Sequence, residues 1–86
     1  MYKVWVKIEN KHKVIKSKIL QSDLALSQFS FEEIVKKACE EWDIGCPVVL
    51  SYHYANFCEF NQAIFKPSDF VEHFGYEKLV FENIGE

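Results

Sequence analysis

"YKVWVKIENKHKVIKSKIL", residues 2–20, opens with the most regular alternation in the chain. Apolar side chains occupy every second position of residues 2–8, and this period of two is typical of a strand with one buried face. The apolar set is Tyr2, Val4, Val6 and Ile8. Residues 9–12 have the composition of a tight turn, so residues 13–20 are predicted to form a second strand, antiparallel to the first.

The register of this hairpin determines which lysines share a face. Pairing Val6 with Ile15 sets apolar side chains opposite one another on the inner face, and it also brings Ile19 opposite Tyr2. A shift by one residue would turn both isoleucines outward, so we predict this register. It places Trp5 among cations on the outer face. The predicted outer surface consists of Lys3, Trp5, Lys7, Val14, Lys16 and Lys18.

Residues 30–45, SFEEIVKKACEEWDIG, carry the start and stop signals of a helix. Ser30 and Glu33 fit a capping box, and Gly45 followed by Pro47 would end the helix. A single apolar stripe opposite charged residues predicts an amphipathic helix packed on one face of the sheet. The stripe consists of Phe31, Ile34, Val35, Ala38, Cys39 and Trp42.

Four further segments complete the expected fold. Residues 47–54, PVVLSYHY, are rich in β-branched and aromatic residues and predict a third strand, with His53 on its solvent side. Residues 58–65 predict a shorter fourth strand, and residues 76–84 predict the last one. Residues 68–75 predict a short α- or 3₁₀-helix with Phe70, Val71 and Phe74 pointing inward. We therefore expect a single α+β domain over residues 1–86.

The composition describes a folded chain with unevenly distributed charge. Hydrophobic residues make up 49% and the formal net charge is −3, yet residues 1–18 hold six lysines and one glutamate. The chain contains no arginine, the side chain best suited to bidentate phosphate recognition, which disfavours nucleic acid as a partner. The three cysteines form no CxxC pair, and no apolar run has the length of a membrane helix. We expect an intracellular protein, cytoplasmic or nuclear, without disulfides.

Residues able to carry chemistry are few and scattered. The candidates for a nucleophile and its base are His53, Cys58, His73, Glu59 and Glu72. No motif orders them into a catalytic arrangement. The same histidines, taken with Cys46 and Cys58, fit no zinc-ligand spacing. We therefore expect no enzymatic activity, no cofactor and no metal.

The predicted order of elements resembles the ubiquitin-like β-grasp. Residues 29–44, FSFEEIVKKACEEWDI, are similar to the opening of the first helix of PB1 domains, and residues 66–74, KPSDFVEHF, fall where these domains carry their short second helix. Lys7 lies where PB1 domains of the basic type place a first-strand lysine. The resemblance implies a ββαββ(short α)β order, one main helix on one face, and a mixed sheet whose last strand is parallel to the first. Residues 52–62, YHYANFCEFNQ, lack the acidic motif of other PB1 domains. Only the basic face would then bind.

We expect a non-enzymatic protein–protein interaction module, a scaffold or adaptor in a larger assembly, that binds an acidic partner protein through the outer surface. Trp5 would anchor the contact while the lysines guide association. The partner could be another ubiquitin-like or PB1-type domain, and no membrane is involved. Three alternatives stay open. In the first, the lysines only protect a strand edge. In the second, the same face stacks single-stranded nucleic acid. In the third, residues 13–18 pair with an acidic strand as Ras-binding domains do.

Overall fold

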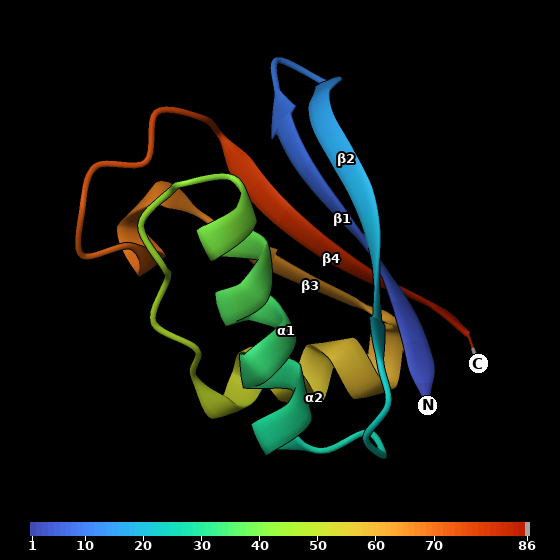
Figure 1. The fold of residues 1–86 in the computed structure, drawn as a ribbon. Coiled ribbons are helices and arrows are strands. Elements are labelled where there is room, and N and C mark those ends of the chain that lie inside the picture. The colour runs from blue at the N-terminus through green and yellow to red at the C-terminus, as the bar shows by residue number, and fades with distance from the viewer. Residues whose placement is uncertain (86) are drawn as a thin grey trace.

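The chain folds into a four-stranded sheet with two helices on the same side (Figure 1). In the computed structural model, which describes residues 1–85, the strand order is β2-β1-β4-β3 and every neighbouring pair is antiparallel. The elements are β1 (Tyr2–Asn10), β2 (Lys13–Ser22), α1 (Gln28–Glu41), α2 (Ser51–Phe60), β3 (Gln62–Phe65), the 3₁₀ turn η1 (Pro67–Asp69) and β4 (Lys78–Gly85). The α+β class predicted from the sequence is confirmed.

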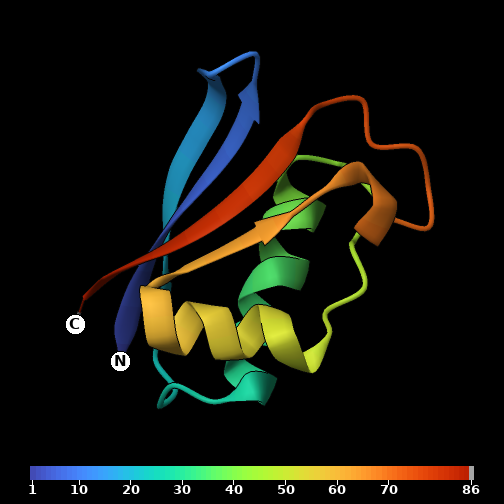
Figure 2. The same cartoon turned by 180° about the vertical axis from the view of Figure 1, so that it is seen from behind.

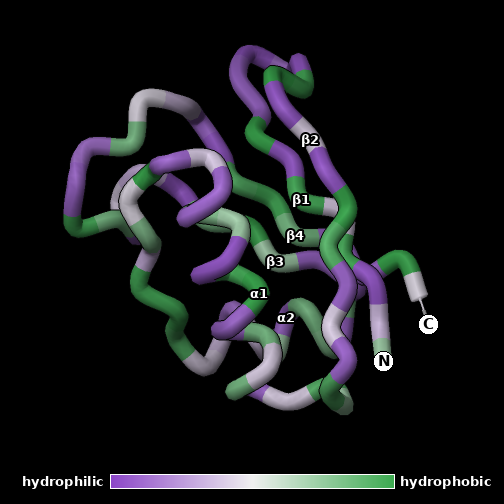
Figure 3. The backbone as a smooth tube through the Cα atoms, viewed as in Figure 1, coloured by the Kyte–Doolittle hydropathy of each residue, from purple (hydrophilic) through white to green (hydrophobic). Residues whose placement is uncertain are grey.

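The core lies between the sheet and the helices. Because side chains alternate along β1, Val4, Val6 and Ile8 point towards the helices and are fully buried; Figure 3 shows hydrophobic and hydrophilic residues alternating along β1. At the centre, the ring of Phe31 on α1 lies 4.7 Å from that of Phe57 on α2, measured between centroids. The opposite face of the sheet carries no helix (Figures 1 and 2).

The sheet is antiparallel throughout, which differs from the predicted mixed sheet. β4 lies beside β1, as expected for the last strand, but Val6 faces Phe81 in an antiparallel ladder. The parallel pairing of first and last strands that the ubiquitin-like resemblance implied is absent from residues 1–85.

The register predicted for the hairpin is wrong. Val4 lies opposite Leu20 and Trp5 opposite Ile19. The observed pairing is displaced from the predicted one by an odd number of residues. The displacement therefore turns Ile19 to the face of the sheet opposite the helices and Lys18 to the helix side. The reason is that only Leu20 and Ser22 are buried in β2. The turn end of the hairpin rises past the helices (Figure 1), so facing inward would not bury the rest of β2.

Helix α1 is confirmed, but its N-terminal cap lies earlier than predicted. Ser27 Oγ accepts the Ser30 backbone N–H at 3.1 Å, and Ser30 Oγ accepts the Ser27 N–H at 3.0 Å. Ser30 and Glu33 therefore do not form the capping box. The predicted stripe from Phe31 to Cys39 is buried, and the helix ends at Glu41, before Gly45.

The third strand predicted over residues 47–54 is wrong. Residues 51–60 form α2, which buries His53 and Phe57, four residues apart on one helix face. Asn61, in the left-handed conformation with φ of 58°, ends the helix. Burial of Phe57 against the rings of Phe31 and Tyr2 outweighs the local strand preference of these residues. His53 is accordingly a buried helix residue, not a solvent-side strand residue.

The C-terminal segments agree more closely with the sequence. β3 keeps the second half of the predicted fourth strand, and β4 matches the last strand. The predicted short helix is only the turn η1, after which Phe70 and Phe74 are buried as expected. Val71 is 85% exposed, so its predicted inward orientation is wrong. None of the helices in residues 1–85 has the length and apolar character that a bilayer crossing requires.

Candidate protein-interaction surfaces

The face of the sheet opposite the helices is the first candidate surface. We call it the open face. Cross-strand pairing assigns its members, because residues opposite one another in an antiparallel ladder point to the same side. On the hairpin these residues are Lys3, Trp5, Lys7 and Glu9 of β1 and Val14, Ser17, Ile19 and Gln21 of β2. On the other strands they are Gln62, Ile64, Lys78, Val80 and Glu82.

An exposed apolar stripe runs along β2. Ile19, directly opposite the half-buried Trp5, is 61% exposed, and Val14 near the turn is 50% exposed. Ile15, at the irregularity in the ladder beside Val14, is also exposed. Exposed large aliphatic side chains on an edge strand of this length are unusual in a monomeric protein without a binding partner.

Lys7 lies at the centre of the open face, but its charge is already compensated. Its Nζ lies 3.8 Å from Glu9 Oε2 and 3.6 Å from Glu82 Oε1. The same Nζ stands 4.3 Å from the centroid of the Trp5 ring. The ammonium thus covers one side of the indole, which reduces the ring area that a nucleic-acid base needs for stacking.

Lys18 is turned to the other side of the sheet, against α1. Its Nζ donates to Glu41 Oε2 at 3.0 Å and lies 4.3 Å from the centroid of the Trp42 ring. Lys16, opposite Ile8, is exposed on the same side. The structure therefore brings Lys3, Trp5, Lys7 and Val14 to one face and separates Lys16 and Lys18 from them. The predicted ring of lysines around Trp5 is not formed.

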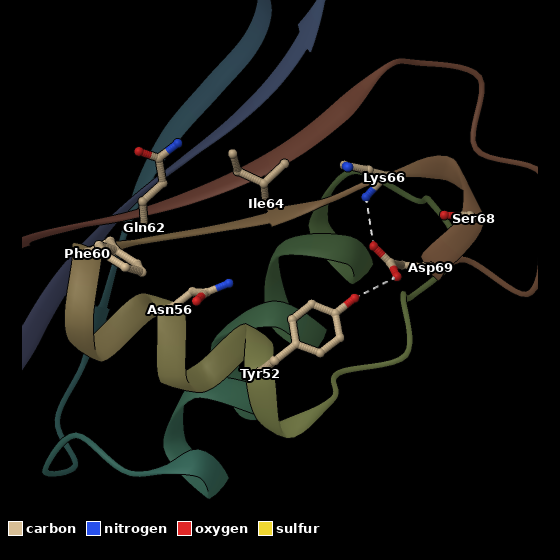
Figure 4. Close-up of a pocket in the computed structure, with 8 residues that line it drawn as sticks. All are labelled: Tyr52, Asn56, Phe60, Gln62, Ile64, Lys66, Ser68 and Asp69. Carbon is tan, nitrogen blue, oxygen red and sulfur yellow. Dashed lines mark hydrogen bonds between the residues drawn. The ribbon is translucent and has the colours of Figure 1, made fainter.

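A groove between α2 and β3 is the second candidate surface (Figure 4). Its volume is about 550 Å³, within the range of peptide and small-molecule sites. One wall consists of α2 side chains spaced four residues apart, and the other of β3 and η1. The lining residues are Tyr52, Asn56, Phe60, Gln62, Ile64, Lys66, Ser68 and Asp69.

Asp69 closes one end of this groove and is held by its neighbours. Its Oδ2 accepts the Lys66 backbone N–H at 2.9 Å, and its Oδ1 accepts the Tyr52 hydroxyl at 3.4 Å. Desolvation and the Asp69 charge both raise the pKa of Tyr52. The carboxylate is thus used to fix the junction of β3, η1 and α2.

His53, one of the candidate bases in the sequence, is enclosed beneath the groove. It is 1% exposed, and its Nδ1 accepts the Leu50 N–H at 2.9 Å, which caps the start of α2. The neutral ring then carries its proton on Nε2, which points at Asp69 Oδ2 from 3.5 Å, too far for a well-formed hydrogen bond. Burial lowers the pKa of His53, against a smaller opposite effect of Asp69. Neither nitrogen is available to a substrate.

The other candidates for chemistry do not converge. Cys58 is exposed on α2, whereas Cys39 is buried on α1. Burial, reinforced by the neighbouring Cys46, raises the pKa of Cys39 to about 12, so this thiol stays protonated and unreactive at neutral pH. Within residues 1–85 no three His, Cys, Asp or Glu side chains gather closely enough to hold a metal ion.

The groove was not predicted from the sequence, because a strand was expected where α2 forms. The signal was present in the spacing of Tyr52, Asn56 and Phe60, which recur every four residues and mark one side of a helix. His53 and Phe57 repeat with the same spacing on the buried side.

In comparisons with known proteins, no family model, no curated protein and no solved structure matches the chain.

Proposed function

We propose that the protein is a non-enzymatic interaction module that binds an acidic partner protein through its N-terminal hairpin. The observation behind this proposal is the exposed apolar stripe along β2, in which Val14 and Ile19 lie on the open face and Ile19 is directly opposite Trp5. Apolar side chains contribute most of the binding free energy in such contacts, and an aromatic residue often lies at their centre. Trp5 and Ile19 are the residues on which binding depends most.

The unpaired lysines of the hairpin favour a partner with a negatively charged surface. Of the six hairpin lysines, only Lys7 and Lys18 form ion pairs within residues 1–85. Lys3 lies on the open face, Lys16 on the opposite side of the edge strand, and the others lie at the turn. Each exposed pair contributes roughly 0–1 kcal/mol, so these lysines guide association and make it sensitive to salt, while the stripe holds the partner.

The edge position of β2 supports pairing with a partner strand as the mode of docking. β2 is ten residues long and has no strand on its outer side in residues 1–85. Its unpaired backbone groups are a template for an added strand, as in the alternative considered for residues 13–18. The antiparallel β1–β4 contact gives no support to the ubiquitin-like or PB1 relationship. The proposal therefore rests on the surface alone.

Affinity capture with matched variants tests the proposal. The wild-type protein is immobilised, and captured proteins are quantified against Ile19→Glu and Lys16→Glu at two salt concentrations. The controls are Val71→Glu, on an exposed apolar residue outside the sheet, and Lys36→Glu, on the exposed side of α1. We expect an acidic protein whose retention falls at least about tenfold with Ile19→Glu, falls less with Lys16→Glu, and is unchanged in both controls. Equal retention by Ile19→Glu would contradict the proposal.

A further inference from the structure

β3 forms the second edge of the sheet, and half of its backbone groups point away from its partner strand β4. The Asn83 N–H donates to the Asn61 carbonyl at 2.8 Å, which fixes the alternation of the antiparallel ladder between β3 and β4. Ala63 and Phe65 then exchange hydrogen bonds with β4, whereas the N–H and C=O groups of Gln62 and Ile64 face away from it. No side chain in residues 1–85 bonds these outward groups. They are free to bond an added strand.

The α2 wall offers contacts for the side chains of such a strand. Tyr52 is half exposed and Phe60 is 65% exposed, two turns apart on the groove side of the helix, with Asn56 between them. Figure 4 shows all three on the part of α2 that borders β3. Exposed aromatic rings beside free backbone groups are the combination by which β-strand addition gains both affinity and side-chain selectivity.

The groove contains one lysine ammonium that a ligand carboxylate could pair with, although the carboxylate of Asp69 also lines the groove. Lys66 lines the groove beyond Ile64, and its ammonium forms no ion pair within residues 1–85. The Asp69 carboxylate is occupied by the Lys66 N–H and the Tyr52 hydroxyl and faces the buried His53. The remaining polar lining, Asn56, Gln62 and Ser68, is uncharged. Lys66 is therefore the one lining cation left to a ligand.

We propose that the groove between α2 and β3 binds an extended peptide segment of another protein as a fifth strand beside β3. The segment carries alternating apolar residues and a carboxylate side chain that reaches Lys66. β2, the strand of the hairpin surface, lies at the opposite edge of the sheet. This groove is thus a separate site, independent of the function proposed for the hairpin.

Peptide selection followed by chemical-shift mapping tests this site. Random nine-residue peptides displayed on phage are selected on the wild-type protein, and an enriched peptide is titrated into ¹⁵N-labelled protein. We expect enrichment of alternating apolar sequences with an Asp or Glu, and saturable amide shifts at Gln62, Ile64 and Lys66. Absence of enrichment over an uncoated surface, or shifts confined to β2, would overturn the proposal.

Three variants separate the groove from the hairpin. Ile64→Pro removes one outward N–H and no ladder hydrogen bond, and Lys66→Glu reverses the free cation; each is expected to weaken the selected peptide at least about fivefold. Ile19→Glu, on the hairpin surface, is expected to leave peptide affinity unchanged. If Ile64→Pro proves unfolded in its ¹⁵N spectrum, Lys66→Glu and the shift map decide. Unaltered affinity in Lys66→Glu would refute the assignment of the ligand charge.

Discussion

Lys18 of β2 bonds Glu41 at the end of α1, with 3.0 Å between Nζ and Oε2. The same ammonium lies against the Trp42 ring and 3.4 Å from the Ala38 carbonyl oxygen. A cation at a helix C-terminus is stabilised by the helix dipole as well as by its ion pair. The contact fastens the edge strand to the helix layer, and it exists only because the hairpin adopts the observed register.

Lys18→Ala is therefore expected to lower the free energy of unfolding by about 1 kcal/mol, through loss of the ion pair and of the contact with Trp42. The midpoint of thermal unfolding would fall by about 4–8 °C for a domain of this size. Lys16→Ala is the matched control, since Lys16 is exposed without an ion pair in residues 1–85, and should change stability by less than about 0.5 kcal/mol. Equal losses in the two variants would argue against this register.

Ser30→Ala is expected to destabilise the protein by about 1–3 kcal/mol in urea denaturation. Ser30 Oγ lies 2.8 Å from the buried Tyr2 hydroxyl and also accepts the Ser27 N–H, so truncation leaves both groups unsatisfied. Glu33→Ala tests the capping box predicted from the sequence. Because Glu33 is exposed and makes no capping contact in residues 1–85, its removal should have an effect below about 0.5 kcal/mol.

Phe57 and Phe60 provide a matched pair that tests the helical character of residues 51–60. Phe57 is fully buried, and Phe57→Ala should cost about 3–5 kcal/mol of unfolding free energy. Phe60 is exposed at the rim of the groove, so Phe60→Ala should cost less than about 0.5 kcal/mol. The urea midpoints of the two variants give the comparison. Similar losses would be incompatible with the observed faces of α2.

Burial of His53 predicts a stability that falls in mild acid. Its folded-state pKa is lowered from the ordinary value of 6.5, so below that pH the unfolded chain binds a proton more readily than the folded one. The stabilising contribution is complete above pH 6.5 and is lost as the pH falls towards the folded-state pKa. The carboxylate of Asp69, which faces Nε2, favours the protonated ring and so makes this loss of stability smaller.

Urea titrations at pH 7.5, 6.5 and 5.5 measure this dependence, with a slope of up to about 1.4 kcal/mol per pH unit. His53→Gln is the control, since its side-chain oxygen can accept the Leu50 N–H but does not titrate. Its unfolding free energy should vary less over the same range. A wild-type slope matching that of His53→Gln would remove His53 as the cause.

Local pattern was sufficient for elements whose buried face is unambiguous. Strict alternation in residues 2–8 and the apolar stripe from Phe31 to Cys39 each allow one way of burying their hydrophobic side chains. The open face could be predicted only in part, because Lys3, Trp5, Lys7 and Val14 follow from alternation and the turn, whereas Lys16 and Lys18 depend on register. The groove could not be predicted once residues 47–54 were assigned to a strand.

The amino-acid sequence by itself determined the α+β class, the first hairpin, the amphipathic helix and the concentration of lysines in the first two strands. Tertiary structure decided which side of β2 faces the helices, and for residues 51–60 it decided between a local strand preference and a four-residue helical spacing. In β2 the apolar residues fit two registers, and the choice depends on which positions the helices cover. In α2 the strand preference of the residues yields to the burial of Phe57 and His53, which requires the rest of the core to be in place.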